Sequence, residues 1–175
     1  MKNLMTSALA LTALTLGSQA LAGSAGPAVV EPAMVAPASQ AHDWSGWYGD
    51  AYVGHWLSGG IAGNYGGVNL GYNLSNGAGG IYGGEIGLFY DPSATLTSFS
   101  ISARAGMNIS DNTLGFARIG LGHDVAPAAT YYSLGLGLQY AFGNDMYARG
   151  EYVYSGVIPA PGNSSSLRLG IGWEF

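Results

Sequence analysis

The feature that most constrains this chain is its last ten residues, 166–175, which read SLRLGIGWEF. Every second residue is apolar, and this period of two predicts a β-strand with two unlike faces. The apolar face ends on Trp173 and Phe175, whereas the other face holds two glycines and two opposite charges, Arg168 and Glu174. A transmembrane β-barrel explains these faces best, because its outer surface meets lipid and its interior is polar. The alternative is an edge strand of a soluble sandwich.

The same alternation recurs along most of the chain. It predicts strands at residues 47–56, 61–73, 80–90, 98–109, 113–122, 131–142, 146–154 and 166–175. Strands of about ten residues are long enough to cross a bilayer at a tilt. Turns containing Asn76, Asp111 and Asn144 would face the periplasm together with both chain ends, and the other connections would be short extracellular loops. The prediction is an all-β fold: an eight-stranded antiparallel up-and-down transmembrane β-barrel.

Composition agrees with a membrane barrel. Only 9% of the residues are charged, against about 25% in ordinary soluble domains. The chain has no Cys, which excludes a disulfide scaffold and a Cys-ligated metal site. Aromatic residues gather near the predicted strand ends, and those on the outer face would form the girdles that such barrels place at the membrane interfaces.

The first residues predict secretion. Lys2 precedes an apolar stretch at residues 4–16, and Ala20-Leu21-Ala22 is a cleavage site of the A-x-A type. We therefore expect a signal peptide at residues 1–22, a Pro- and Ala-rich periplasmic spacer at 23–43, and the barrel at 44–175. Without the signal, four arginines oppose ten Asp and Glu residues, a formal charge of −6. Nucleic acid is not expected as a partner.

The stretch PAVVEPAMVAPASQAHDWSGWYGDAYVGH resembles the start of the small outer-membrane β-barrel proteins of alphaproteobacteria, a "porin family" of OmpA-like barrel domains. The matching motif runs from Trp44 to Tyr48 and is completed by Gly54; GVNLGYN at 67–73, Glu151-Tyr152 and Phe175 also match. The resemblance implies an outer-membrane location. It also implies that the terminal aromatics, Trp173 and Phe175, form the signal that the barrel assembly machinery reads.

The charged residues fall on one face of the predicted strands. All the arginines and four acids face the lumen, namely Asp50, Glu85, Arg104, Arg118, Arg149, Glu151, Arg168 and Glu174. An Arg facing lipid would cost about 2–4 kcal/mol at the midplane, and an eight-stranded barrel is just wide enough for side chains to fill it. We expect a paired charge network that plugs the lumen; a charged pore constriction is the alternative.

These patterns favour a non-enzymatic outer-membrane barrel with a structural role in envelope integrity. A narrow porin-like channel is one alternative. The other is an enzyme that modifies lipid A, for which His55 and His123-Asp124 lie near the outer end of their strands without a nucleophile motif. We expect outer-membrane lipid and lipopolysaccharide as partners and no catalytic residue, metal or cofactor; the oligomeric state is left open.

Overall fold

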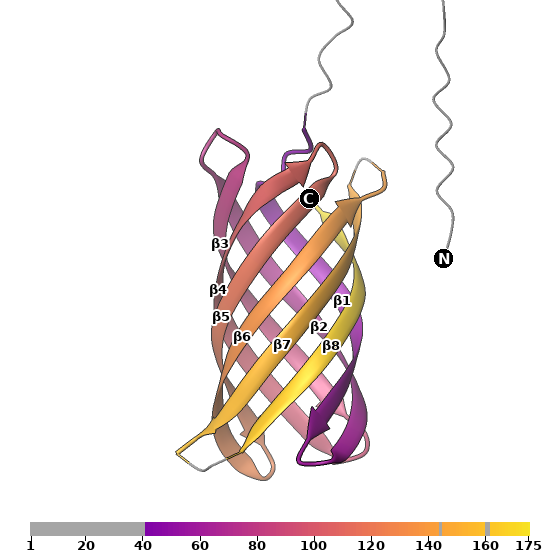
Figure 1. The fold of residues 1–175 in the computed structure, drawn as a ribbon, viewed down its shortest axis with the longest axis vertical. Helices are drawn as coiled ribbons and strands as arrows, with labels where there is room; N and C mark the ends of the chain where they lie inside the picture. Colours follow the sequence, from indigo (N-terminus) through magenta and orange to yellow (C-terminus); the bar gives the residue numbers. More distant parts are fainter. Residues whose placement is uncertain (1–40, 144, 160–161) are drawn as a thin grey trace, which may run out of the picture. The chain divides into compact units, whose positions relative to one another are not determined.

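The computed structural model describes residues 41–143, 145–159 and 162–175. Its strands are β1 (Gly46–Ser58), β2 (Ile61–Ser75), β3 (Gly80–Asp91), β4 (Leu96–Ser110), β5 (Thr113–Val125), β6 (Ala128–Ala141), β7 (Met146–Ile158) and β8 (Asn163–Glu174). Each strand pairs antiparallel with the next, and β8 pairs with β1, which closes an eight-stranded barrel (Figure 1). This confirms the predicted fold class. The predicted signal peptide at 1–22, and the spacer as far as residue 40, lie outside the described residues.

The barrel has two distinct ends. The C-terminus lies at the upper end in Figure 1, together with the connections that follow β2, β4 and β6; we call this the terminal end. The opposite end, with the connections that follow β1, β3, β5 and β7, is the far end. At the far end β1 and β2 are joined by Gly59 and Gly60 alone, both with positive φ (57° and 88°). Two positive φ values define the type I′ turn that suits a tight hairpin.

All eight strands were predicted, but the observed strands are longer at the far end. β7 continues to Ile158 and β5 to Val125, where the prediction ended at Tyr154 and Gly122. Backbone pairing explains the difference, because Val125 still pairs with Ala128 across the β5–β6 turn. A ladder of backbone hydrogen bonds needs no apolar alternation, so the sequence pattern stops before the strand does.

The two faces of the sheet are the reverse of those in a soluble protein. Outward-facing residues on β6 such as Leu136 are exposed (66%), whereas its inward-facing Ser133 and Gln139 are buried. The same arrangement repeats on every strand, so that apolar side chains cover the outside and polar and aromatic ones fill the inside. In the described part of the chain, no helix is long and apolar enough to cross a membrane.

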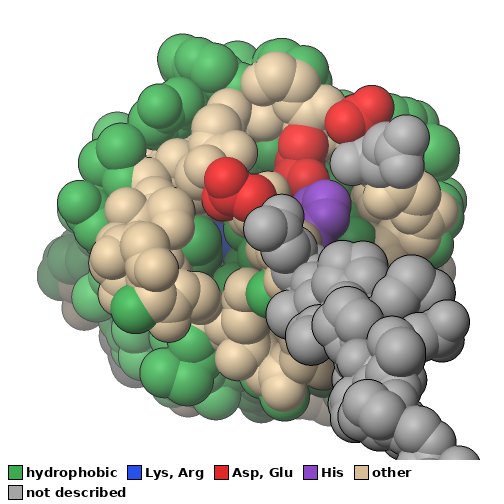
Figure 2. All heavy atoms as spheres, turned by 90° about the horizontal axis from the view of Figure 1, so that it is seen from above, with side chains coloured by type: hydrophobic (Ala, Val, Ile, Leu, Met, Phe, Trp, Pro, Cys, Tyr) green, Lys and Arg blue, Asp and Glu red, His purple; other side chains and the backbone are tan. Residues whose placement is uncertain are grey.

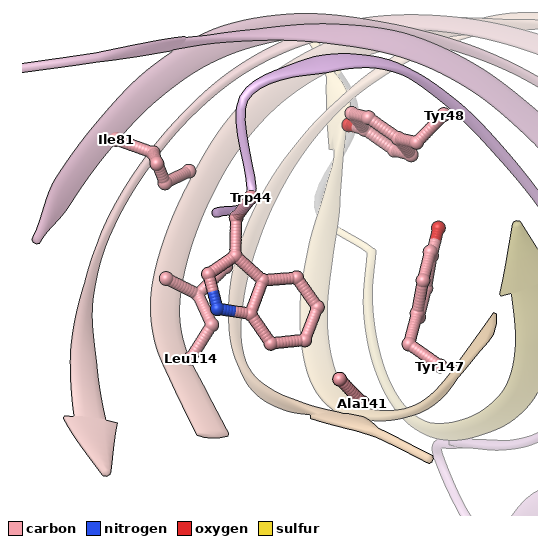
Figure 3. Close-up of a cluster of buried hydrophobic side chains, with 6 residues drawn as sticks. All are labelled: Trp44, Tyr48, Ile81, Leu114, Ala141 and Tyr147. Carbon is pink, nitrogen blue, oxygen red and sulfur yellow. The ribbon is translucent and has the colours of Figure 1, made fainter. Parts of the chain in front are cut away.

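Residues just before β1 close the terminal end. Trp44 is buried inside the barrel among Tyr48, Ile81, Leu114, Ala141 and Tyr147 (Figure 3). Its backbone oxygen accepts a hydrogen bond of 2.9 Å from Asn73 Nδ2. In the view onto this end, hydrophobic side chains form an outer rim around a polar centre with acidic and histidine side chains (Figure 2). We expected residues 23–43 to be a spacer, but His42 contacts the barrel through hydrogen bonds to Glu174 and to the backbone of Asp111.

Candidate functional site

Arg149 on β7 is the centre of the charged lumen. Its Nη1 atom lies 2.8 Å from Asp50 Oδ2 and 2.7 Å from Glu85 Oε2, and its Nη2 atom lies 3.0 Å from Glu151 Oε2. One guanidinium thus bridges carboxylates from β1, β3 and β7. All four side chains are almost completely buried, and charged groups in such a place need both opposite charges and hydrogen bonds.

Two further arginines complete a cluster that we call the charge layer: Asp50, Glu85, Arg104, Arg118, Arg149 and Glu151. Arg118 Nε lies 2.7 Å from Glu151 Oε1, and Arg118 Nη1 lies 3.9 Å from Glu85 Oε1. Arg104 Nη1 lies 4.0 Å from Glu85 Oε2. Three positive charges therefore face three negative ones, and the layer is formally neutral.

Uncharged side chains hydrogen-bond the charge layer. The Tyr48 hydroxyl donates to Glu85 at 3.0 Å, and the Asn69 amide donates to Asp50 at 2.7 Å. Arg104 donates to the Gln139 side-chain oxygen. The Phe116 ring lies against two guanidiniums, with its centroid 4.4 Å from Arg104 Cζ and 4.8 Å from Arg149 Cζ. Such cation–π contacts fill the lumen while favouring the positive charge.

Glycines make room for these aromatic side chains. A Cβ atom built on Gly137 would lie 2.7 Å from Phe116 Cε1 and 2.7 Å from the backbone oxygen of Gly150. Gly71 and Gly172 are covered in the same way by the rings of Tyr48 and Tyr147. The glycines on the inner face of the predicted strands therefore leave space for lumen rings on neighbouring strands.

Two of the eight predicted network residues form no ion pair with the charge layer, although Arg168 lies opposite Glu151 in the β7–β8 ladder. Arg168 is nearer the far end, where its Nε donates to the Tyr65 hydroxyl at 2.8 Å and its guanidinium lies over the rings of Tyr52 and Tyr65. Glu174 lies at the terminal end, with Oε2 at 2.6 Å from His42 Nε2. The structure thus brings six of the eight residues together. Face alternation predicted that all eight point inward, but it carries no information on their height along the barrel.

Sequence reasoning left several residues of the lumen out of the predicted network. Gln139, Tyr48 and Phe116 stand on the inner face of their predicted strands, and this position was the available signal. Trp44 and His42 precede the first strand, where no period exists to assign them. The predicted assembly residues Trp173 and Phe175 lie on the outer surface at the terminal end, where Phe175 is 75% exposed.

Comparison with solved structures identifies the architecture. Neisserial surface protein A superimposes with a TM-score of 0.54 at 19% identity over 75% of this chain and 98% of its own. Ail, the attachment invasion locus protein of Yersinia pestis, superimposes with a TM-score of 0.54 at 16% identity, over 75% of this chain and 99% of its own. A de novo designed transmembrane β-barrel superimposes with a TM-score of 0.53 at 13% identity, over 77% of this chain and 99% of its own. The fold is that of the transmembrane β-barrels. No protein-family model and no curated protein sequence matches the chain.

The two histidines that the sequence places near the outer ends of their strands lie on separate strands of the barrel. His55 on β1 and His123 on β5 are both exposed, and their Nδ1 atoms contact Asn64 Oδ1 at 2.8 Å and Thr130 Oγ1 at 3.2 Å. Asp124, the neighbour of His123, instead accepts a hydrogen bond from Ser98 inside the barrel. Among the described residues, no three His, Asp or Glu side chains are arranged to hold a metal ion.

The arrangement of the lumen is suited to blocking passage. Charged groups that line a conducting pore face water, whereas those of the charge layer face one another across the barrel axis. On the terminal side of the layer the lumen is filled by Trp44, Tyr48 and Tyr147, with ring centroids 6.0 Å apart for Trp44–Tyr147 and 6.5 Å for Tyr48–Tyr147. The interior is a polar core with a hydrophobic cap at the terminal end.

Proposed function

We propose that this protein is an integral outer-membrane β-barrel. Its outer surface exposes large apolar side chains on every strand, and a contiguous apolar surface marks contact with lipid or with another protein. Aromatic side chains lie on the outer surface near both ends, among them the exposed pair Trp47–Tyr72 at the terminal end and the exposed Tyr132 beside the half-buried Tyr154 towards the far end. The signal-like N-terminus and the likeness to solved transmembrane barrels support this location, with the terminal end in the periplasm.

We further propose a structural, non-enzymatic role in the cell envelope, with a lumen that does not conduct. The observation that carries this proposal is the charge layer, whose six side chains are each at most 4% exposed. Water and ions would need to break several buried ion pairs to pass. Outer-membrane lipid and lipopolysaccharide are the proposed surroundings, and the barrel assembly machinery is the proposed partner during insertion.

Planar-bilayer recording tests the closed lumen. The wild-type protein is expected to insert without producing conductance steps. A matched triple variant, Trp44→Ala, Phe116→Ala and Arg149→Ala, removes side chains from the hydrophobic cap and from the region of the charge layer. The folded variant is expected to produce conductance steps. Discrete steps from the wild-type protein would instead support the narrow porin-like channel.

Lipid A mass spectrometry tests the non-enzymatic role. Spectra from cells with and without the protein are expected to be identical, because the ring of His123 contacts Thr130 Oγ1, whereas the Asp124 carboxylate accepts a hydrogen bond from Ser98 inside the barrel. A mass change that depends on the protein and is lost in His55→Ala or His123→Ala would support a lipid A-modifying enzyme. Fractionation of cells, with the protein in the outer-membrane fraction, tests the location independently.

A further inference from the structure

A cavity of about 410 Å³ occupies the far end of the lumen, between the rim and the charge layer. Its walls include the rings of Trp56, Tyr65, Phe89 and Tyr131, together with smaller apolar and polar side chains. These rings are in contact: the centroids of Tyr65 and Phe89 are 5.3 Å apart and those of Phe89 and Tyr131 are 6.4 Å apart. Small-molecule sites are typically concave, of roughly 300–1,000 Å³, and lined by apolar and aromatic side chains with few polar groups.

Arg168 on β8 supplies the positive charge of this cavity. Among the described residues, its side chain makes one hydrogen bond, from Nε to the Tyr65 hydroxyl at 2.8 Å, and the same hydroxyl donates to Ser166 Oγ at 2.9 Å. Within the described residues no carboxylate lies within 4.0 Å of its guanidinium, in contrast to the three arginines of the charge layer. The Nη1 and Nη2 edge is therefore available, while Nε and the rings beneath fix its orientation.

The two acids of the cavity are already engaged. Asp91 accepts hydrogen bonds from Trp56 Nε1 at 2.6 Å and from the backbone of Ser93 at 2.8 Å. Asp124 accepts one from the Ser98 hydroxyl. They do not pair with Arg168, but their negative charge limits how much additional negative charge the cavity accepts.

We propose that this cavity binds a small organic monoanion with a flat apolar body, such as an aromatic carboxylate. The carboxylate would lie on the Nη1 and Nη2 edge of Arg168, where planar two-point pairing is favourable. The apolar body would lie against Phe89 and Tyr131. A polyanion would be repelled by Asp91 and Asp124, and a neutral analogue would leave Arg168 without an anion. This site goes beyond the proposed structural role and does not depend on it.

Isothermal titration calorimetry of the full mature chain in detergent tests the proposal, with benzoate as the probe. Benzoate is expected to bind saturably. Benzyl alcohol and benzene-1,3,5-tricarboxylate are expected to bind with dissociation constants at least about tenfold higher. Arg168→Gln is expected to weaken benzoate binding by about tenfold or more, with benzyl alcohol unaffected. Absence of benzoate binding, or equal binding of all three probes, would overturn the proposal.

A second variant keeps the test decisive if Arg168→Gln fails to fold. Ser155→Phe places a ring in the cavity from β7, away from Arg168 and from the charge layer. It is expected to abolish benzoate binding while leaving the heat-dependent gel mobility of a folded barrel unchanged. Undiminished benzoate binding by a folded Ser155→Phe variant would place the probe elsewhere and contradict the proposal.

Discussion

Arg149 shows at residue scale how a charge is tolerated at the centre of a membrane-type barrel. Its guanidinium contacts Asp50, Glu85 and Glu151, and each of these acids has at least one further donor from another side chain. Burial alone would disfavour every one of these charges. The acids and bases are equal in number and each forms at least one hydrogen bond, which offsets part of this cost.

Replacing Arg149 with Met is expected to destabilise the barrel by about 3–5 kcal/mol, because it leaves buried carboxylates without their shared partner. Urea unfolding in detergent micelles, followed by tryptophan fluorescence, measures the change. Glu174→Gln at the terminal end is the matched control and is expected to have a small effect, since the ion pair of the Glu174 side chain among the described residues is with His42, outside the charge layer. Equal unfolding midpoints for wild-type and Arg149→Met protein would contradict this account.

Gln139→Glu is expected to be milder than the loss of the side-chain oxygen, because the new carboxylate would lie beside Arg104. Gln139 already accepts a hydrogen bond from Arg104, whose Nε and Nη1 atoms are buried without an acceptor among the described residues. A carboxylate here would give Arg104 a direct ionic partner. Gln139→Leu, which removes the acceptor, is expected to cost about 1–3 kcal/mol. The interpretation fails if the unfolding curves show that the Gln139→Glu variant is less stable than the Gln139→Leu variant.

At the scale of the element, β6 (Ala128–Ala141) explains why the strands were predictable. Leu134, Leu136 and Leu138 alternate with Ser133, Gly135 and Gly137, and the period of two is uninterrupted. A one-residue shift would turn every leucine into the lumen and every small residue outward, so the pattern fixes the faces. The strand cores and the inward direction of the charges followed from this alternation.

What could not be predicted depends on contacts between distant parts of the chain. The separation of Arg168 from the other arginines depends on strand tilt and stagger, which one sequence does not encode in its period. The caps formed by His42 and Trp44 depend on partners on β2, β7 and β8. The far-end extensions depend on backbone pairing, to which the identity of the side chains contributes little.

Leu136→Arg tests the outer face of β6. Leu136 lies at mid-strand on the outer surface, where an arginine costs about 2–4 kcal/mol in lipid. The variant is expected to fold in detergent but to insert poorly into lipid vesicles and to accumulate weakly in outer membranes. Leu136→Met is the control and should insert normally. Equal insertion of both variants would mean that this face does not meet lipid.

At the scale of the whole molecule, the barrel is closed by the pairing of β1 with β8. The Phe175 amide donates to the Trp47 backbone oxygen at 3.0 Å, so the ladder continues to the last residue. A closed barrel has no free sheet edge from which to separate. Unboiled protein is therefore expected to migrate faster than boiled protein in detergent gels, and identical mobility would argue against closure.

Deleting Phe175 is expected to reduce outer-membrane levels in cells while leaving refolding in detergent close to normal. The side chain is 75% exposed, so its loss removes little burial, less than the about 1.5–3 kcal/mol of a fully buried large apolar side chain. Quantitative immunoblots of membrane fractions, with Phe175→Tyr as the control, measure the effect in cells. Wild-type levels of the deletion variant would exclude an assembly signal at this residue.

The charge layer has a consequence for how such a barrel assembles. Its members come from β1, β3, β4, β5 and β7, so no single hairpin contains the whole set, and the β3–β4 hairpin holds only the pair Glu85–Arg104. An incomplete sheet in the membrane would hold arginines and acids with part of their partners missing, and each missing partner raises its free energy. Only closure brings β7 back beside β1 through β8 and satisfies the layer at once. The ion pairs therefore favour cooperative insertion: intermediates with few strands are penalised, and the completed ring is the first state in which every charge of the charge layer has its partners.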